Sequence, residues 1–158
     1  MTADFLPRSD KRPDSLPFRS SGLLILVVDD DPGIRRLICS FLRNATMAGI
    51  LETSDPSAAS STASNGRRLI DLLISDIRLS ADITGIDLAH KLTVQNPAMK
   101  VLLISATGRP RFQKPSEWRF LEKPFALSDV LDCVSTLCSP VSGSNLLELH
   151  REASPIDE

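Results

Sequence analysis

The sequence lacks any apolar run long enough to span a membrane, and its first residues lack the apolar core of a secretory signal. It also has few cysteines: Cys39, Cys133 and Cys138 are scattered, without CxxC spacing or a paired framework. We interpret these thiols as packing residues in a reducing compartment, and we expect a cytoplasmic protein that has no membrane partner.

Histidine and tryptophan are also rare, and the chain has no excess of positive charge. His90 and His150 have no acidic or thiol partners at metal-ligand spacing, so we predict that both lie on the surface. The single tryptophan, Trp118, is predicted to pack under a loop. A formal net charge of -2 and a pI near 5.7 argue against a nucleic-acid partner.

The most informative stretch of the sequence is Leu69–Leu79, a largely apolar run that presents one carboxylate, Asp76, near its end. Residues 69–74 are too few for a free-standing helix and rich in branched side chains, which predicts a strand buried on both faces. In an open parallel sheet, chemistry is found where the carboxyl ends of the strands emerge. Asp76 stands at that end.

A second apolar run, Leu23–Val28, is followed at once by the acids Asp29, Asp30 and Asp31. If the two strands are neighbours, Asp29, Asp30 and Asp76 converge into one pocket. Clustered carboxylates repel one another and need a cation, and an all-oxygen site with few protein ligands suits Mg²⁺. Asp31, followed by proline, is instead predicted to cap a helix.

Strand and helix patterns alternate along the chain, which predicts an α/β fold with a parallel sheet and right-handed crossovers. We expect a disordered leader over residues 1–22, one domain over 23–138 and a flexible tail over 139–158. The remaining strands are predicted at 50–53, 101–104 and 120–122, and the helices at 32–44, within 55–66, from 86 to 97 and around 130–138.

Four separated motifs in this order, VVDDD, SDIRL, LLISATG and FLEKPF, resemble those of the response-regulator receiver domains of bacterial two-component signalling. The resemblance covers residues 23–138. It implies a flavodoxin-like, doubly wound sheet of five parallel strands in the order 2-1-3-4-5. It also implies phosphorylation of Asp76 by a sensor histidine kinase or a phosphotransfer protein.

The resemblance further assigns metal ligands. Asp30, Asp76 and the backbone carbonyl of Arg78 would bind Mg²⁺ directly, and Asp29 would assist through water.

Around the phosphoryl group, the resemblance places Lys123 and the hydroxyl of Ser105. Movement of Ser105 would let Phe120 turn inward, a switch that keeps an aromatic ring but lacks the tyrosine hydroxyl common in the family. The peptide bond between Lys123 and Pro124 is expected to be cis.

The sequence also departs from the family pattern. Ser80 replaces a usual proline, Ala126 replaces a usual helix-capping Ser or Thr, and two prolines between Gly108 and Trp118 predict an irregular or shortened fourth helix. Since that helix forms part of the family's output face, the geometry of output is left open.

We therefore expect a single-domain regulator, a monomer or weak dimer, which signals through protein contacts. It would catalyse only its own phosphorylation and dephosphorylation. Two alternatives remain open from the sequence. The first is a degenerate receiver that serves as a phosphorylation-independent interaction module. The second is an aspartate-nucleophile phosphatase, which the spacing of Asp29 and Asp31 mimics.

Overall fold

The computed structural model describes residues 22–66, 68–80, 82–106, 108, 115 and 118–139. Within them a single parallel sheet of five strands has the order β2-β1-β3-β4-β5, which confirms the predicted flavodoxin-like topology. The strands are β1 (Leu24–Val28), β2 (Gly49–Thr53), β3 (Leu72–Asp76), β4 (Lys100–Ser105) and β5 (Trp118–Glu122). The helices are α1 (Pro32–Ala45), α2 (Pro56–Asn65), α3 (Gly85–Gln95) and α4 (Leu127–Cys138).

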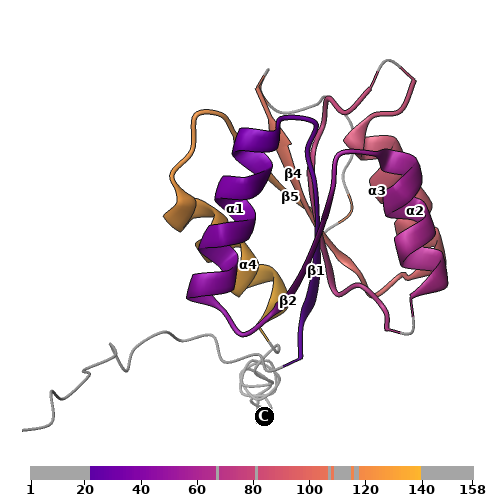
Figure 1. Cartoon of the computed structure of the whole chain (residues 1–158), viewed down its shortest axis with the longest axis horizontal. Coiled ribbons are helices and arrows are strands. Elements are labelled where there is room, and N and C mark those ends of the chain that lie inside the picture. Colours follow the sequence, from indigo (N-terminus) through magenta and orange to yellow (C-terminus); the bar gives the residue numbers. More distant parts are fainter. Residues whose placement is uncertain are drawn as a thin grey trace, which may run out of the picture.

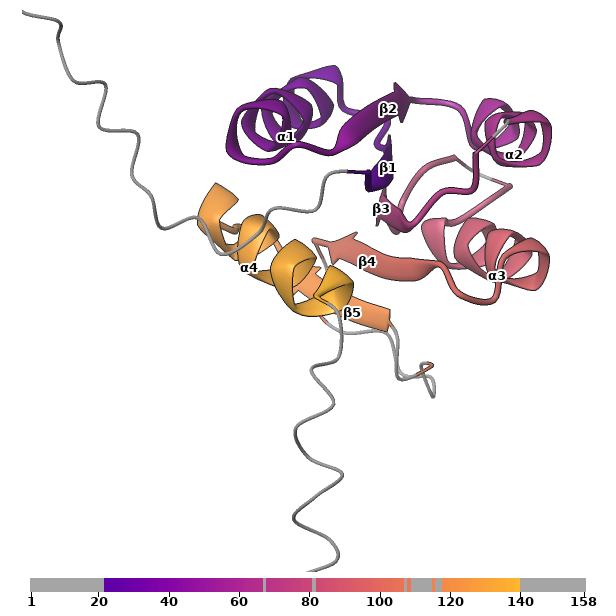
Figure 2. The same cartoon turned by 90° about the horizontal axis from the view of Figure 1, so that it is seen from below.

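Helices cover both faces of the sheet. Helices α1 and α4 lie on one face, and α2 and α3 lie on the other (Figures 1 and 2). Alternate residues of the central strands enter the two resulting cores: in β1, Ile25 and Val27 pack towards α1 and α4, while Leu26 and Val28 pack towards the opposite helices. The central strands β1, β3 and β4 are therefore apolar in their interiors, as burial on both faces requires, and the polar residues of β3 and β4 lie at the strand ends.

Residues close in sequence stabilise the first turns of α1 and α4. The carboxylate of Asp31 accepts hydrogen bonds from the backbone N–H groups of Gly33 and Ile34, which confirms the predicted cap of α1. At α4 the N-cap residue is Ala126, which has no capping side chain. The carboxylate of Asp129 accepts the Ala126 N–H at 2.8 Å and so supplies half of a capping box.

One sequence prediction, the placement of Leu69 in a buried strand, is wrong. Leu69 is 63% exposed and precedes β3, because pairing with the neighbouring strands begins only near Asp71, whose N–H donates to the Leu24 carbonyl. Trp118 is the first residue of β5 and is 1% exposed. The loop before it lies largely outside the described residues, so its packing under a loop stays a prediction. The indole of Trp118 lies 4.7 Å, centroid to centroid, from the ring of His90, which is exposed on α3 as predicted.

Several predictions fall on residues that the structure does not describe. The leader over 1–22, the tail over 139–158 and the irregular helix between positions 108 and 118 lie outside the described residues, apart from Gly22, Gly108, Pro115, Trp118 and Ser139. No helix within the described ranges combines the length and the apolar character needed to cross a membrane.

Candidate metal centre

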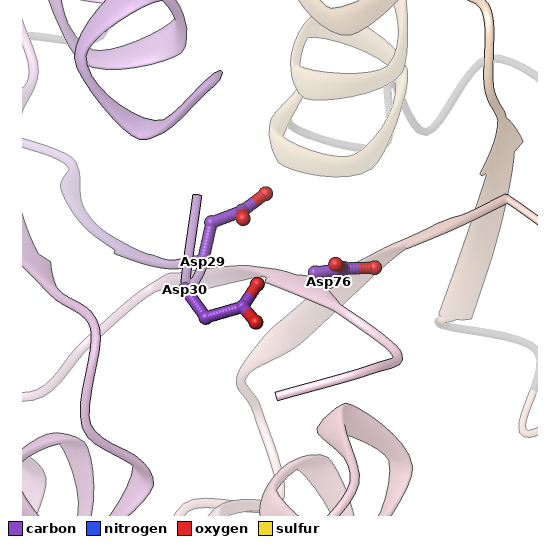
Figure 3. Close-up of side chains that lie close together, drawn as sticks. All are labelled: Asp29, Asp30 and Asp76. Atoms are coloured by element: carbon purple, nitrogen blue, oxygen red, sulfur yellow. The ribbon is translucent and has the colours of Figure 1, made fainter. Parts of the chain in front are cut away.

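Strands β1 and β3 are parallel neighbours, and their carboxyl ends bring three acids together. Val28 pairs with Ser75, so Asp29, the next residue along, emerges opposite Asp76 at the end of β3. Asp29, Asp30 and Asp76 each offer a carboxylate oxygen, and these oxygens all lie within 4.8 Å of one another (Figure 3). The predicted convergence of these acids is therefore present in the fold.

The acids differ sharply in exposure. Asp30 is exposed, whereas Asp29 is 1% exposed and Asp76 is 7% exposed. One oxygen of Asp29, Oδ1, accepts the backbone N–H of Asp31 at 2.9 Å. The other, Oδ2, is buried and has no hydrogen-bond partner among the described residues.

Burial without full compensation changes the acidity of Asp29. Desolvation raises its pKa to about 6, and the nearby carboxylates of Asp76 and Asp30 act in the same direction. The Asp31 N–H and the Lys123 ammonium oppose this rise without cancelling it. An unpartnered buried carboxylate oxygen beside two further carboxylates is what a site for a hard cation would contain, and the oxygen-only donor set fits Mg²⁺.

The positively charged side chain of Lys123 lies at the same edge of the sheet as the three acids. The Lys123 ammonium is 3.4 Å from Oδ2 of Asp76, and the peptide bond between Lys123 and Pro124 is cis, the isomer that the family resemblance implies. The backbone N–H of Lys123 donates to the carbonyl of Ser105 at 2.8 Å. This bond ties the segment after β5 to the carboxyl end of β4.

The proposed switch residues also lie near this end of the sheet. Ser105 is 4% exposed, and its hydroxyl donates to the carbonyl of Gly108 at 2.8 Å. Phe120 is half-buried, packs against the core on the α2 and α3 face, and lines a hollow together with Ser105 and Glu122. Inward movement of this ring stays a prediction.

Arg78 has an exposed side chain two residues beyond Asp76. Its backbone N–H points at Oδ1 of Asp76 over 3.4 Å, a long and weak contact. A ligand role for its carbonyl stays a prediction.

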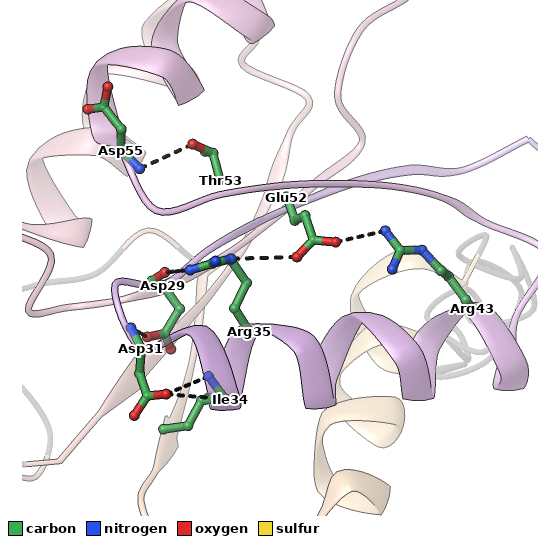
Figure 4. Close-up of polar contacts among 9 residues, drawn as sticks. Asp29, Asp31, Ile34, Arg35, Arg43, Glu52, Thr53 and Asp55 are labelled. Carbon is green, nitrogen blue, oxygen red and sulfur yellow. Dashed lines mark hydrogen bonds and ion pairs between the residues drawn. The ribbon is translucent and has the colours of Figure 1, made fainter.

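Two features of the site were not anticipated from the sequence. Gly85 is the first residue of α3 and lies directly against the backbone of Asp76. Arg35, on α1, donates to the backbone carbonyl of Asp29 and pairs with Glu52 on β2 (Figure 4). Each contact joins two separate elements of the fold, so neither can be read from the sequence alone.

Comparison with known proteins agrees with this geometry. Residues 25–135 match the response regulator receiver domain family. The chain is 33% identical over 115 residues to the probable transcriptional regulatory protein TcrX of Mycobacterium tuberculosis, covering 68% of this chain and 46% of that protein. It is 32% identical over 139 residues to the transcriptional regulatory protein GlrR of Escherichia coli, covering 84% of this chain and 30% of that protein. The chain thus spans less than half the length of these curated relatives.

Solved structures give the same result. The receiver domain of the hybrid histidine kinase CckA is 27% identical, with a TM-score of 0.62 over 72% of this chain and 97% of that chain. A response regulator receiver domain protein from Clostridium thermocellum has a TM-score of 0.65 over 73% of this chain and 93% of that chain. At 21% identity, the second likeness supports the fold alone.

Proposed function

Because the chain belongs to the response regulator receiver family, we propose that it accepts a phosphoryl group on Asp76 from a phosphohistidine and signals through protein contacts. The family is a signalling module rather than a classical enzyme, and its members are phosphorylated by histidine kinases. The observation that carries the proposal is the cluster of three carboxylates, with the Lys123 ammonium 3.4 Å from Asp76.

The reaction needs a nucleophile and a way to disperse charge. A carboxylate oxygen of Asp76 attacks phosphorus, the phosphorus–nitrogen bond to the donor imidazole breaks, and an acyl phosphate forms on Asp76. Asp30, Asp76 and the Arg78 carbonyl would hold Mg²⁺ directly, and Asp29 would assist through water. The ion, when bound, neutralises charge on the phosphoryl oxygens.

The residues on the other side of Asp76 complete the site. Lys123 supplies a fixed positive charge to the phosphoryl oxygens, and its present contact with Oδ2 of Asp76 places it within reach. Ser105 turns its hydroxyl towards the same group, and Phe120 follows into the space that Ser105 leaves. We place the output in protein contacts made by a monomer or weak dimer, with no nucleic-acid or membrane partner.

A hydrolase of the aspartate-nucleophile class fits less well. In that class the acid two residues after the nucleophile must be free to transfer protons. Here the Asp31 carboxylate accepts the Gly33 and Ile34 N–H groups at 2.7 and 3.1 Å, and these bonds lower its pKa. Asp31 is therefore committed to holding the start of α1.

Phosphorylation by a small donor tests the proposal. Incubation with acetyl phosphate and Mg²⁺ is expected to add one phosphoryl group to the intact mass, and excess chelator is expected to prevent the gain because the acids are then unneutralised. A folded protein that gains no mass in Mg²⁺ would contradict the proposal and favour the phosphorylation-independent interaction module.

The raised pKa of Asp29, about 6, predicts how Mg²⁺ binding depends on pH. Affinity should be constant well above pH 6 and fall by up to about tenfold for each pH unit below it, because a protonated Asp29 no longer offers its negative charge to the metal and its water. In the metal-free protein, the free energy of unfolding depends on pH in the opposite direction from Mg²⁺ affinity. Because the carboxyl pKa of Asp29 is higher in the folded protein than in the unfolded chain, the fold gains stability as pH falls from about 6 towards 4, and this gain is absent above about pH 6.

Isothermal titration calorimetry between pH 5 and 8 measures the affinity. An Mg²⁺ affinity that does not change between pH 7 and pH 5 would show that Asp29 is ionised throughout this range or takes no part in binding.

A further inference from the structure

Asp29 is held by its backbone and by one carboxylate oxygen, which leaves the other oxygen for a ligand. Its N–H donates to the carbonyl of Thr53 over 3.3 Å, and its Oδ1 accepts the N–H of Asp31. Its backbone carbonyl accepts Nη1 of Arg35 at 2.7 Å, the shortest of these three contacts. Only Oδ2 lacks a hydrogen-bond partner among the described residues.

The carbonyl that Arg35 binds belongs to the peptide group joining Asp29 to Asp30. This peptide is planar, so fixing its carbonyl fixes the direction in which the chain enters Asp30. A charged donor to a carbonyl makes a stronger hydrogen bond than a neutral one. Arg35 therefore acts on the relative orientation of two of the three clustered acids without touching either carboxylate.

Arg35 is itself held in place. Its Nε lies 3.5 Å from Oε2 of Glu52, while Oε1 of Glu52 lies 3.1 Å from Nη2 of Arg43 (Figure 4). The Arg35 side chain is only 17% exposed, whereas that of Arg43 is 48% exposed. One planar guanidinium thus contacts a carbonyl and a carboxylate through different nitrogens, which the single ammonium of a lysine cannot reproduce.

We propose that Arg35 is a positioning residue of the magnesium site, which holds the Asp29–Asp30 peptide, and that Glu52 orients Arg35. The inference rests on the proposed function, since it assumes that the acids bind Mg²⁺. Residues that orient metal ligands commonly change metal affinity by about 10- to 100-fold when replaced. A partly exposed contact to the backbone lies at the low end of that range.

Arg35→Met tests the inference, and Arg43→Met is its matched control. Both substitutions remove an arginine that pairs with Glu52, but only Arg35 reaches Asp29. By isothermal titration calorimetry at pH 7.5, Arg35→Met is expected to weaken Mg²⁺ binding by about tenfold. Arg43→Met should stay within about twofold of the parent, and Glu52→Gln should fall between them.

A second readout needs no metal. Amide hydrogen exchange in the metal-free protein should be faster at Asp29 and Asp31 in Arg35→Met than in Arg43→Met, because the turn after β1 has lost its tether. A purely structural role would instead lower the free energy of unfolding in urea and leave both the Mg²⁺ affinity and the local exchange as in the control.

The outcomes separate this inference from the proposed function. If the parent binds Mg²⁺ and Arg35→Met binds it equally well, the positioning role is wrong and the proposed function stands. If the parent binds no Mg²⁺, the proposed function fails and takes the inference with it. Should Arg35→Met not fold, Arg35→Lys decides: intermediate affinity supports the role, and parental affinity overturns it.

Discussion

Replacing Gly85 by alanine is expected to lower the free energy of unfolding by about 3 kcal/mol or more. A Cβ atom at this position would overlap with the carbonyl oxygen of Asp76 and would lie 2.8 Å from Oγ of Ser75. Both neighbours are held: Asp76 ends a buried strand, and the Ser75 hydroxyl donates to that same carbonyl. Helix α3 must therefore move away from β3, because nothing at the contact can yield.

The matched control is Gly33→Ala, also in the first turn of a helix. There the new Cβ would lie 3.1 Å from Oδ1 of Asp31, a side-chain atom, and alanine favours the helix. Its free energy of unfolding should stay within about 1 kcal/mol of the parent. Urea unfolding of both variants without metal measures the difference, and equal stability of Gly85→Ala and Gly33→Ala would rule out close packing against Asp76.

Movement of α3 has a functional consequence. The Gly85 N–H donates to the carbonyl of Ile77 at 2.8 Å, and the Thr84 and Asp87 side chains fix the start of the helix. Alanine at position 85 would therefore displace the segment that follows Asp76, including Arg78. The close packing that allows only glycine at position 85 also fixes the backbone next to Asp76, the proposed phosphoacceptor.

Much of the architecture was readable from local patterns. Apolar runs at Leu23–Val28 and 101–104 predicted buried strands, and the acids that follow the first run predicted where a pocket would form. Asp31 before proline predicted a helix start that the structure contains. These predictions succeeded because strand burial and helix capping depend on residues close together in sequence.

The prediction failed, or missed a contact, where the local structure depends on residues distant in the sequence. Leu69 looks like part of a buried strand, yet the ladder with β1 and β4 starts after it, and nothing local fixes that register. The last strand was predicted to begin at position 120, yet β5 begins at Trp118, because Trp118 pairs with Val101 of β4. The Arg35 contact with Glu52 joins α1 to β2, so no spacing rule could indicate it.

Asp76→Asn is expected to abolish phosphoryl gain altogether. Asparagine has nearly the same shape and keeps a carbonyl oxygen, but a neutral amide does not attack phosphorus to give an acyl phosphate. The fold should survive because the substitution removes one of three mutually repelling charges, at the cost of the 3.4 Å contact with Lys123. Loss of reactivity in a protein that unfolds like the parent would then reflect chemistry and not stability.

The measurement that tests the central claim most directly is the intact mass of the parent, Asp76→Asn and Asp82→Asn after incubation with Mg²⁺ and acetyl phosphate. Asp82 is an exposed acid in the loop beyond the site and serves as the control. A gain of one phosphoryl group in the parent and in Asp82→Asn, with none in Asp76→Asn, is the predicted result. An equal gain in Asp76→Asn, or none in the folded parent, would contradict the assignment of Asp76 as the acceptor.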